Sequence, residues 1–88
     1  MAWKIEYADA AGRVIRKLDR QQAKRILDYM DKRVAPADDP RQLGAAMVGE
    51  RAGKWRYRIG DYRVVCQLID DRLVILVIDV GHRREVYR

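Results

Sequence analysis

Several residue types with functional roles are missing from this 88-residue chain. It contains no Ser, Thr, Asn or Phe, and it has one Cys and one His. Ser and Thr nucleophiles are therefore excluded, and the single Cys66 cannot form an internal disulfide. One His and one Cys are too few for the usual zinc sites, and the Gly-Lys-Ser/Thr sequence of a phosphate-binding loop is missing. We therefore expect no metal site and no cofactor.

Long hydrophobic runs are also missing. The longest apolar stretch, residues 73–78, is far shorter than the roughly 20 residues of a membrane-spanning helix. The first residues lack the basic segment and apolar core that mark a secretory signal. These features predict a cytoplasmic protein that makes no contact with a membrane.

The composition is typical of one small folded domain, which we expect to cover residues 1–88. Hydrophobic residues make up 49% of the chain, which is enough for one core and too much for a disordered protein. A chain of this length is too short for two domains.

Positive charge is concentrated in two segments. The formal net charge is +6, and 14 of the 19 basic residues are Arg. Residues 51–63 carry a net +4 and residues 82–88 a net +2, so the rest of the chain is balanced. Such clustering indicates a polyanion as ligand, and the guanidinium group suits phosphate because it donates two parallel hydrogen bonds. The alternative is a solvated basic surface without a ligand.

The first half of the chain predicts one strand and two helices. Apolar and polar residues alternate over residues 1–7, as in a half-buried strand. Asp9 is a candidate N-cap for a helix over about residues 9–18. Asp19, with Gln22 three positions later, resembles a capping box for a second helix, which would form a hairpin with the first. This second helix has the clearest pattern, an apolar stripe made of Ala23, Ile26, Leu27, Met30 and Val34.

The second half predicts a loop and three strands. Residues 36–53 show no clear period, so we expect irregular structure with at most one short turn. The strands are expected over residues 54–59, 62–69 and 73–80, joined by turns at Gly60–Asp61 and Asp70–Asp71. Gly81 is expected to interrupt the last strand, whose apolar residues predict a central position with both faces covered. The predicted fold is α+β, in the order β-α-α-β-β-β, with the helical hairpin packed on a mostly antiparallel four-stranded sheet.

One face of the strand at residues 54–59 is entirely basic and cannot lie in the core. Arg56 and Arg58 point to the same side, and the tight turn brings Arg63 of the next strand alongside them. Arg83 and Tyr87 follow the last strand, and we expect them to fold over the same surface. The result is a basic patch with aromatic members, which suits single-stranded nucleic acid.

Such a patch also suits the cleavage of RNA, which supplies its own nucleophile in the 2′-OH. The reaction needs an acceptor for the 2′-OH proton, cations for the pentavalent phosphate and a proton donor for the leaving 5′ oxygen. Arginines placed at the developing charge meet the second need without a metal ion. A His, or a Tyr whose phenolate is favoured by nearby guanidinium groups, is a candidate for the first.

Two segments together resemble the RelE family of toxin–antitoxin systems. They are WRYRIGDYRVVCQL at residues 55–68 and VGHRREVYR at residues 80–88. The resemblance implies a type II toxin that is a metal-independent endoribonuclease and cuts mRNA in the A site of the 70S ribosome. It also implies a cognate antitoxin that neutralises the toxin and provides its only link to DNA.

The resemblance also implies roles for individual residues. The residues implied to be catalytic are Arg58, Arg63, Arg83 and Tyr87. The residues expected to bind RNA are Arg56, Lys54, Arg84 and His82. Because the family often has Lys at the positions of Arg56 and Arg58, and a guanidinium does not release its proton, these two are left with phosphate stabilisation.

Two other functions stay open. The related ParE toxins have a similar hairpin and inhibit DNA gyrase without enzymatic activity, in which case the basic residues would form an interface. The chain would otherwise be an RNA- or ribosome-binding module without chemistry. For single residues, the alternatives are an ion pair of Arg63 with Asp61 or Asp70 and a packing role for Tyr87.

Overall fold

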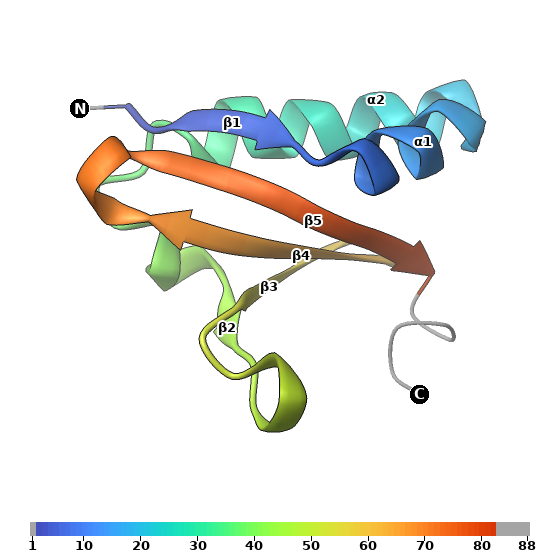
Figure 1. Ribbon diagram of the computed structural model, residues 1–88. Coiled ribbons are helices and arrows are strands. Elements are labelled where there is room, and N and C mark those ends of the chain that lie inside the picture. Colours follow the sequence, from blue (N-terminus) through green and yellow to red (C-terminus); the bar gives the residue numbers. More distant parts are fainter. Residues whose placement is uncertain (1, 83–88) are drawn as a thin grey trace.

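Residues 2–82, which the computed structural model describes, form two helices on one face of a five-stranded sheet (Figure 1). The strands are β1 (Lys4–Tyr7), β2 (Ala45–Ala46), β3 (Trp55–Ile59), β4 (Tyr62–Ile69) and β5 (Val74–His82). Their order in the sheet is β1-β5-β4-β3-β2, with β1 parallel to β5 and all other neighbours antiparallel. The predicted α+β class and mostly antiparallel sheet are confirmed, but the described residues form five strands and not four.

The additional strand arises in the segment that was predicted to be irregular. Asp39 accepts a hydrogen bond from the Arg41 N–H at 3.1 Å and so caps a 3-10 turn, Pro40–Leu43. The chain then pairs briefly with β3 as β2 and makes a second 3-10 turn, Gly49–Arg51. Two alanines carry no periodic signal, so β2 is identified only by its pairing with β3.

The two helices, α1 (Asp9–Lys17) and α2 (Arg20–Tyr29), form the predicted hairpin. α2 continues into a π-helical turn, Met30–Val34, in which the Ala35 N–H donates to the Met30 carbonyl at 2.9 Å. The apolar stripe of the second helix is confirmed, because Ile26, Met30 and Val34 are all fully buried. No helix within residues 2–82 is long and apolar enough to cross a membrane.

The predicted helix caps differ from those observed. The N-cap of α1 is Ala8, and Asp9 lies in the first helical turn, where a carboxylate interacts favourably with the helix dipole. Asp19 is the N-cap of α2 as predicted, but its side chain makes no capping hydrogen bond. The capping box with Gln22 is therefore wrong for this helix.

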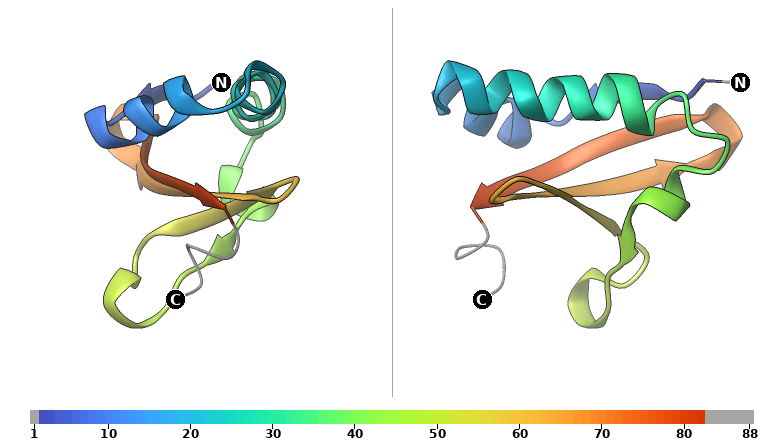
Figure 2. Two further views of the ribbon diagram at one scale, coloured as in Figure 1. Left: turned by 90° about the vertical axis from the view of Figure 1, so that its right-hand side faces the viewer. Right: turned by 180° about the vertical axis from the view of Figure 1, so that it is seen from behind.

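The hydrophobic core lies between the helices and the sheet. Figures 1 and 2 show α1 and α2 covering one face, while the segment that contains β2 and the 3-10 turn Gly49–Arg51 projects from the other side. The side chains that close the core from the sheet are mainly those of Tyr57, Ile59, Val64, Cys66, Ile75 and Val77. The two faces of the sheet therefore differ in cover, and the face without helices is called the helix-free face below.

The longest strand, β5, differs from its prediction in two respects. It continues through Gly81, which pairs with Arg63, so the predicted interruption is wrong. The irregularity lies at Ile78 of β5. Val77 and Asp79 on either side of it pair with Cys66 and Val65 of β4, whereas Ile78 has no partner on β4, as in a β-bulge. β5 is an internal strand as predicted, but Leu76 and Ile78 are only half-buried, so its helix-free face is partly covered.

Candidate nucleic-acid interface

The pairing of β3 with β4 brings three of the predicted arginines together. Arg58 lies directly opposite Arg63, and Arg56 lies opposite Val65. Directly opposite residues share one face of the sheet, with Cα atoms about 4.5–5.5 Å apart. The alternate residues of both strands lie in the core, so Arg56, Arg58 and Arg63 point to the helix-free face. The part of the predicted grouping that concerns these three arginines is confirmed, and they are called the arginine face.

The three arginines differ in exposure. Arg58 is exposed and Arg56 is half-buried, whereas Arg63 is 2% exposed. Arg63 lies in the middle of the sheet between Arg58 of β3 and Gly81 of β5, and the glycine places no side chain beside it. An anion that lies between two opposite arginines can accept charge-assisted hydrogen bonds from both of them.

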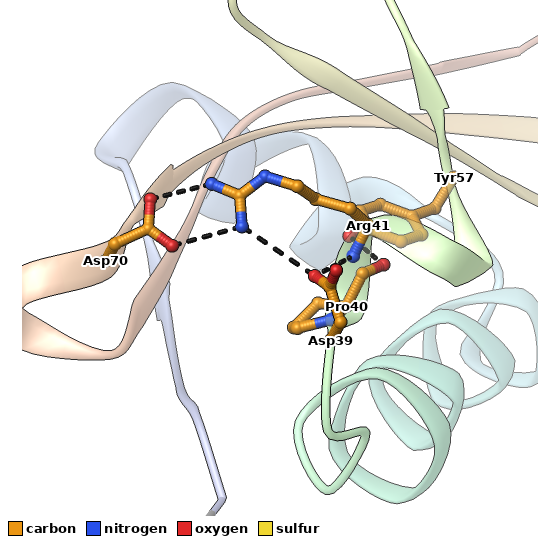
Figure 3. A network of polar contacts seen from close by, with 5 residues as sticks. All are labelled: Asp39, Pro40, Arg41, Tyr57 and Asp70. Atoms are coloured by element: carbon orange, nitrogen blue, oxygen red, sulfur yellow. Dashed lines mark hydrogen bonds and ion pairs between the residues drawn. The ribbon is translucent and has the colours of Figure 1, made fainter.

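A network of polar contacts fixes the 3-10 turn Pro40–Leu43 against the sheet (Figure 3). The Arg41 guanidinium donates to both Asp70 carboxylate oxygens, at 3.0 and 2.6 Å, and these bonds lower the pKa of Asp70. The Tyr57 hydroxyl donates to the Pro40 carbonyl at 2.9 Å. Arg41 also lies over the Trp55 ring, 5.8 Å from its centroid. Asp70 is thus the partner of Arg41. It follows the end of β4, whereas Arg63 lies near the start of that strand, so the predicted alternative of an ion pair between Arg63 and Asp70 is wrong.

Two other predicted residues occupy different places. Lys54 precedes β3, and its backbone closes a loop, because its N–H donates to the Arg51 carbonyl and its carbonyl accepts from the Met47 N–H, both at 3.0 Å. His82 pairs with Tyr62, and the two rings meet edge to face at 5.6 Å. Tyr62 and His82 line a cavity of about 260 Å³ with Arg25 of α2, so His82 lies on the helix side of the sheet.

The structure therefore does not bring His82 onto the arginine face, and its predicted binding of RNA stays a prediction. The remaining predicted site residues lie outside the described residues: Arg83, Arg84 and Tyr87.

Prediction from the sequence missed one contact on the helix-free face. The Arg51 Nη2 donates to the Asp79 Oδ2 at 3.1 Å. Asp79 lies opposite Val65, which in turn lies opposite Arg56, so all three side chains share the face. The available signal was the carboxylate itself, which interrupts the apolar residues of the last strand.

Arg58 also borders a second basic feature. A groove of about 460 Å³ lies between the end of β3 and α2, and its lining includes Arg25, Tyr29, Lys32 and Arg33. The Arg33 guanidinium lies 5.9 Å from the centroid of the Tyr29 ring. Arg58 therefore belongs both to the arginine face and to the lining of this groove.

The single thiol is part of the core. Cys66 is fully buried on β4, and burial raises the pKa of its thiol well above the usual value. A thiolate nucleophile is therefore not available at this position. Residues 2–82 contain no group of three or more His, Cys, Asp or Glu side chains that would hold a metal ion.

Residues 5–87 match the family model described as ParE toxin of type II toxin-antitoxin system, parDE. The chain belongs to this ParE toxin family. Among curated proteins, Toxin RelG of Mycobacterium tuberculosis strain H37Rv is 23% identical to it over 88 residues, which cover 100% of this chain and 99% of RelG. The predicted resemblance to toxins of the RelE/ParE superfamily is confirmed, and the chain is a type II toxin.

Solved structures of RelE toxins share this toxin's fold. A chain of the RelBE2 toxin–antitoxin complex from Mycobacterium tuberculosis matches with a TM-score of 0.86 and 20% identity, over 94% of this chain and 93% of that one. The isolated RelE toxin of E. coli matches with a TM-score of 0.61 and 26% identity, over 98% and 92% of the two chains.

Proposed function

We propose that this toxin is a ribosome-dependent, metal-independent mRNA endoribonuclease that works in the cytoplasm. The observation that carries the proposal is the cross-strand pair of Arg58 and Arg63 on the helix-free face. Two guanidinium groups on adjacent rigid strands are preorganised for the oxygens of one phosphate, which binds them through charge-assisted hydrogen bonds. Strands hold such groups more firmly than loops do.

The reaction is a transesterification in which RNA supplies the nucleophile. The 2′-OH loses its proton and its oxygen attacks the adjacent phosphorus, while the bond from phosphorus to the 5′ oxygen breaks. The leaving 5′ oxygen takes up a proton, so the products are a 2′,3′-cyclic phosphate and a 5′-OH. Arg58 and Arg63 stabilise the charge that grows on the non-bridging oxygens. Arg83 is assigned to the same phosphate and Tyr87 to the proton of the 2′-OH.

The proposal is tested by primer extension on a defined mRNA, with and without 70S ribosomes. Wild type is compared with Arg58→Ala, Arg63→Ala and the control Arg72→Ala, which removes an equal charge from the turn between β4 and β5. We expect cuts at A-site codons only with ribosomes, loss of cutting in the first two variants and normal cutting in the control. End-group mapping should find the cyclic phosphate. Equal cutting by wild type and Arg63→Ala would overturn the proposal.

A second function is favoured by the family match, since the family is named for ParE toxins. In this case the arginine face would contact DNA gyrase and carry out no chemistry. Inhibition of gyrase supercoiling by the toxin, with ribosome-bound mRNA left intact, would establish this function. Binding to ribosomes with neither cutting nor gyrase inhibition would indicate an RNA-binding module.

We also propose that a cognate antitoxin neutralises this toxin. The RelBE2 structure is a toxin–antitoxin complex, and the exposed arginines here suit an acidic segment of a partner protein. Any contact of the toxin with DNA would then pass through the antitoxin. Co-expression with the product of the adjacent open reading frame should yield one complex in size-exclusion chromatography. Separate elution of the two proteins would refute this pairing.

A further inference from the structure

The loop between β2 and β3 presents an arginine to the helix-free face. Its backbone reverses through Gly49 and Gly53, whose φ angles of +72° and +93° lie in the left-handed region that favours glycine. Val48 near its tip is 85% exposed, so hydrophobic packing does not hold this part of the loop. Figure 2 shows the loop projecting from the side of the sheet opposite the helices.

An ion pair ties this loop to the sheet on the helix-free face. The Arg51 Nη2 lies 3.1 Å from the Asp79 Oδ2, between residues 28 positions apart in the sequence. Asp79 belongs to the cross-strand row of Arg56 and Val65, and the next row contains Arg58 and Arg63. The ion pair therefore places the Arg51 guanidinium on the helix-free face, at β5 and next to the strand that carries Arg63.

The geometry of this ion pair leaves Arg51 able to bind a second anion. The bond to Asp79 uses one of the five N–H donors of the guanidinium. The two side chains are 45% and 40% exposed, so water and a ligand reach both of them. An ion pair this exposed adds little to stability, so it favours this position of the Arg51 guanidinium by a small factor and leaves the group able to contact a ligand.

We propose that Arg51 is a further phosphate-binding residue of this face and that Asp79 is its positioning residue. The ligand is the phosphodiester backbone of single-stranded RNA, at a phosphate next to the one held by Arg58 and Arg63. This assignment rests on the proposed function of the arginine face, and it adds a contact from a loop to those from the strands.

The contact is tested by fluorescence anisotropy with a short, unstructured, fluorescein-labelled RNA in a series of salt concentrations. Arg51→Ala should weaken binding about tenfold, as expected for loss of a charged hydrogen bond. It should also reduce the slope of log K against log salt by about 0.7, because one phosphate contact of a single strand is lost. Arg72→Ala is the matched control and should change neither quantity. Unchanged binding and slope in Arg51→Ala would overturn the contact.

The positioning role is tested at Asp79 in two backgrounds. Asp79→Ala should weaken RNA binding about threefold in the wild-type background, with Asp79→Glu restoring it, and should cause no further loss alongside Arg51→Ala. If Asp79 only repelled RNA, Asp79→Ala would strengthen binding in both backgrounds, which would overturn the role. Thermal unfolding of each variant checks that its fold is intact.

Primer extension on ribosomes, run with the same variants, separates this contact from the proposed function. If wild type cuts mRNA and Arg51→Ala binds RNA as wild type does, the Arg51 contact is refuted and the proposed nuclease activity stands. The expected binding losses without any cutting would keep the contact and refute the nuclease. If wild type binds no RNA at any salt concentration, the Arg51 contact is refuted, and primer extension alone decides the function.

Discussion

Neighbouring residues of the β3–β4 hairpin lie on opposite faces of the sheet, in very different surroundings. Tyr57 and Val64 are fully buried beneath the helices, whereas Arg58, which follows Tyr57 directly, is exposed on the helix-free face. The helix-covered face gains hydrophobic free energy on folding. The helix-free face also buries some side chains, Val65 among them, but it sets the charged groups of Arg58 and Arg63 directly opposite each other. We therefore expect most of the stability to come from the helix-covered face and binding to depend on the exposed side chains of the other face, such as that of Arg58.

The largest effect on stability is expected on the helix-covered face. Ile26 of α2 is fully buried in the core, and Ile26→Ala leaves a cavity there. We expect this variant to lose about 2–5 kcal/mol of the free energy of unfolding, measured by urea denaturation. The control is Val48→Ala, which changes an exposed side chain and should shift stability by no more than about 0.5 kcal/mol. Equal losses in the two variants would contradict the division between the faces.

On the arginine face, function and stability should change independently. Arg58→Leu removes one of two like charges that lie directly opposite each other. We expect the rate of mRNA cutting to fall about a hundredfold, as when one preorganised donor to a transition state is lost. Stability should stay the same or rise by up to about 1 kcal/mol, because the repulsion is relieved. Single-turnover cutting and urea denaturation measure the two quantities, and a parallel fall in both would refute the division.

A smaller effect on stability is expected at Tyr57, a buried residue of the helix-covered face whose hydroxyl has a hydrogen-bond partner. The Tyr57 hydroxyl donates to the Pro40 carbonyl at 2.9 Å in a buried hydrogen bond. Tyr57→Phe should cost about 1–2 kcal/mol of unfolding free energy, since it leaves the buried carbonyl without this donor. Urea denaturation beside Tyr29→Phe provides the comparison, because Tyr29 is only half-buried. A loss as small as that of Tyr29→Phe would show that the bond adds little.

The parts of the fold that were predicted correctly depend on local patterns. The helical spacing of Ile26, Met30 and Val34 predicted the buried stripe of α2, and the Gly60–Asp61 turn predicted the pairing of β3 with β4. Gly60 has a φ of +60°, which lies in the left-handed region that favours glycine in such a turn. Once this register is set, the alternation of side chains places Arg58 and Arg63 together.

The parts that were not predicted depend on partners far away in the sequence. The strand β2 exists because Ala45 and Ala46 pair with β3, and β5 continues through Gly81 because Arg63 pairs with it. Arg51 and Asp79 meet only after the whole sheet has formed. His82 was expected to bind RNA, yet its side chain lies on the helix side of the sheet, because a strand sends successive side chains to opposite faces.

The smallest expected effect lies on the helix-covered face at β1 and depends on pH. The Tyr7 hydroxyl is buried, and no hydrogen-bond partner for it lies among the described residues. Burial, with a lesser contribution from Asp31, raises the pKa of Tyr7 from 10.0 to about 12. The folded state thus holds the phenolic proton more tightly than the unfolded chain does. The stability that this contributes is complete below pH 10 and is lost as the pH rises from 10 towards 12.

Tyr7→Phe should therefore match wild type at neutral pH or exceed it by up to about 1 kcal/mol, because it removes a buried hydroxyl that has no partner among the described residues. Above pH 10 the variant should lose less stability than wild type, since it has no phenol to ionise at this position. Thermal unfolding at pH 7 and through the alkaline range measures both effects. A marked loss at pH 7 would show that the hydroxyl stabilises the fold, and Tyr7 would then join Tyr57 as a satisfied polar group of the helix-covered face.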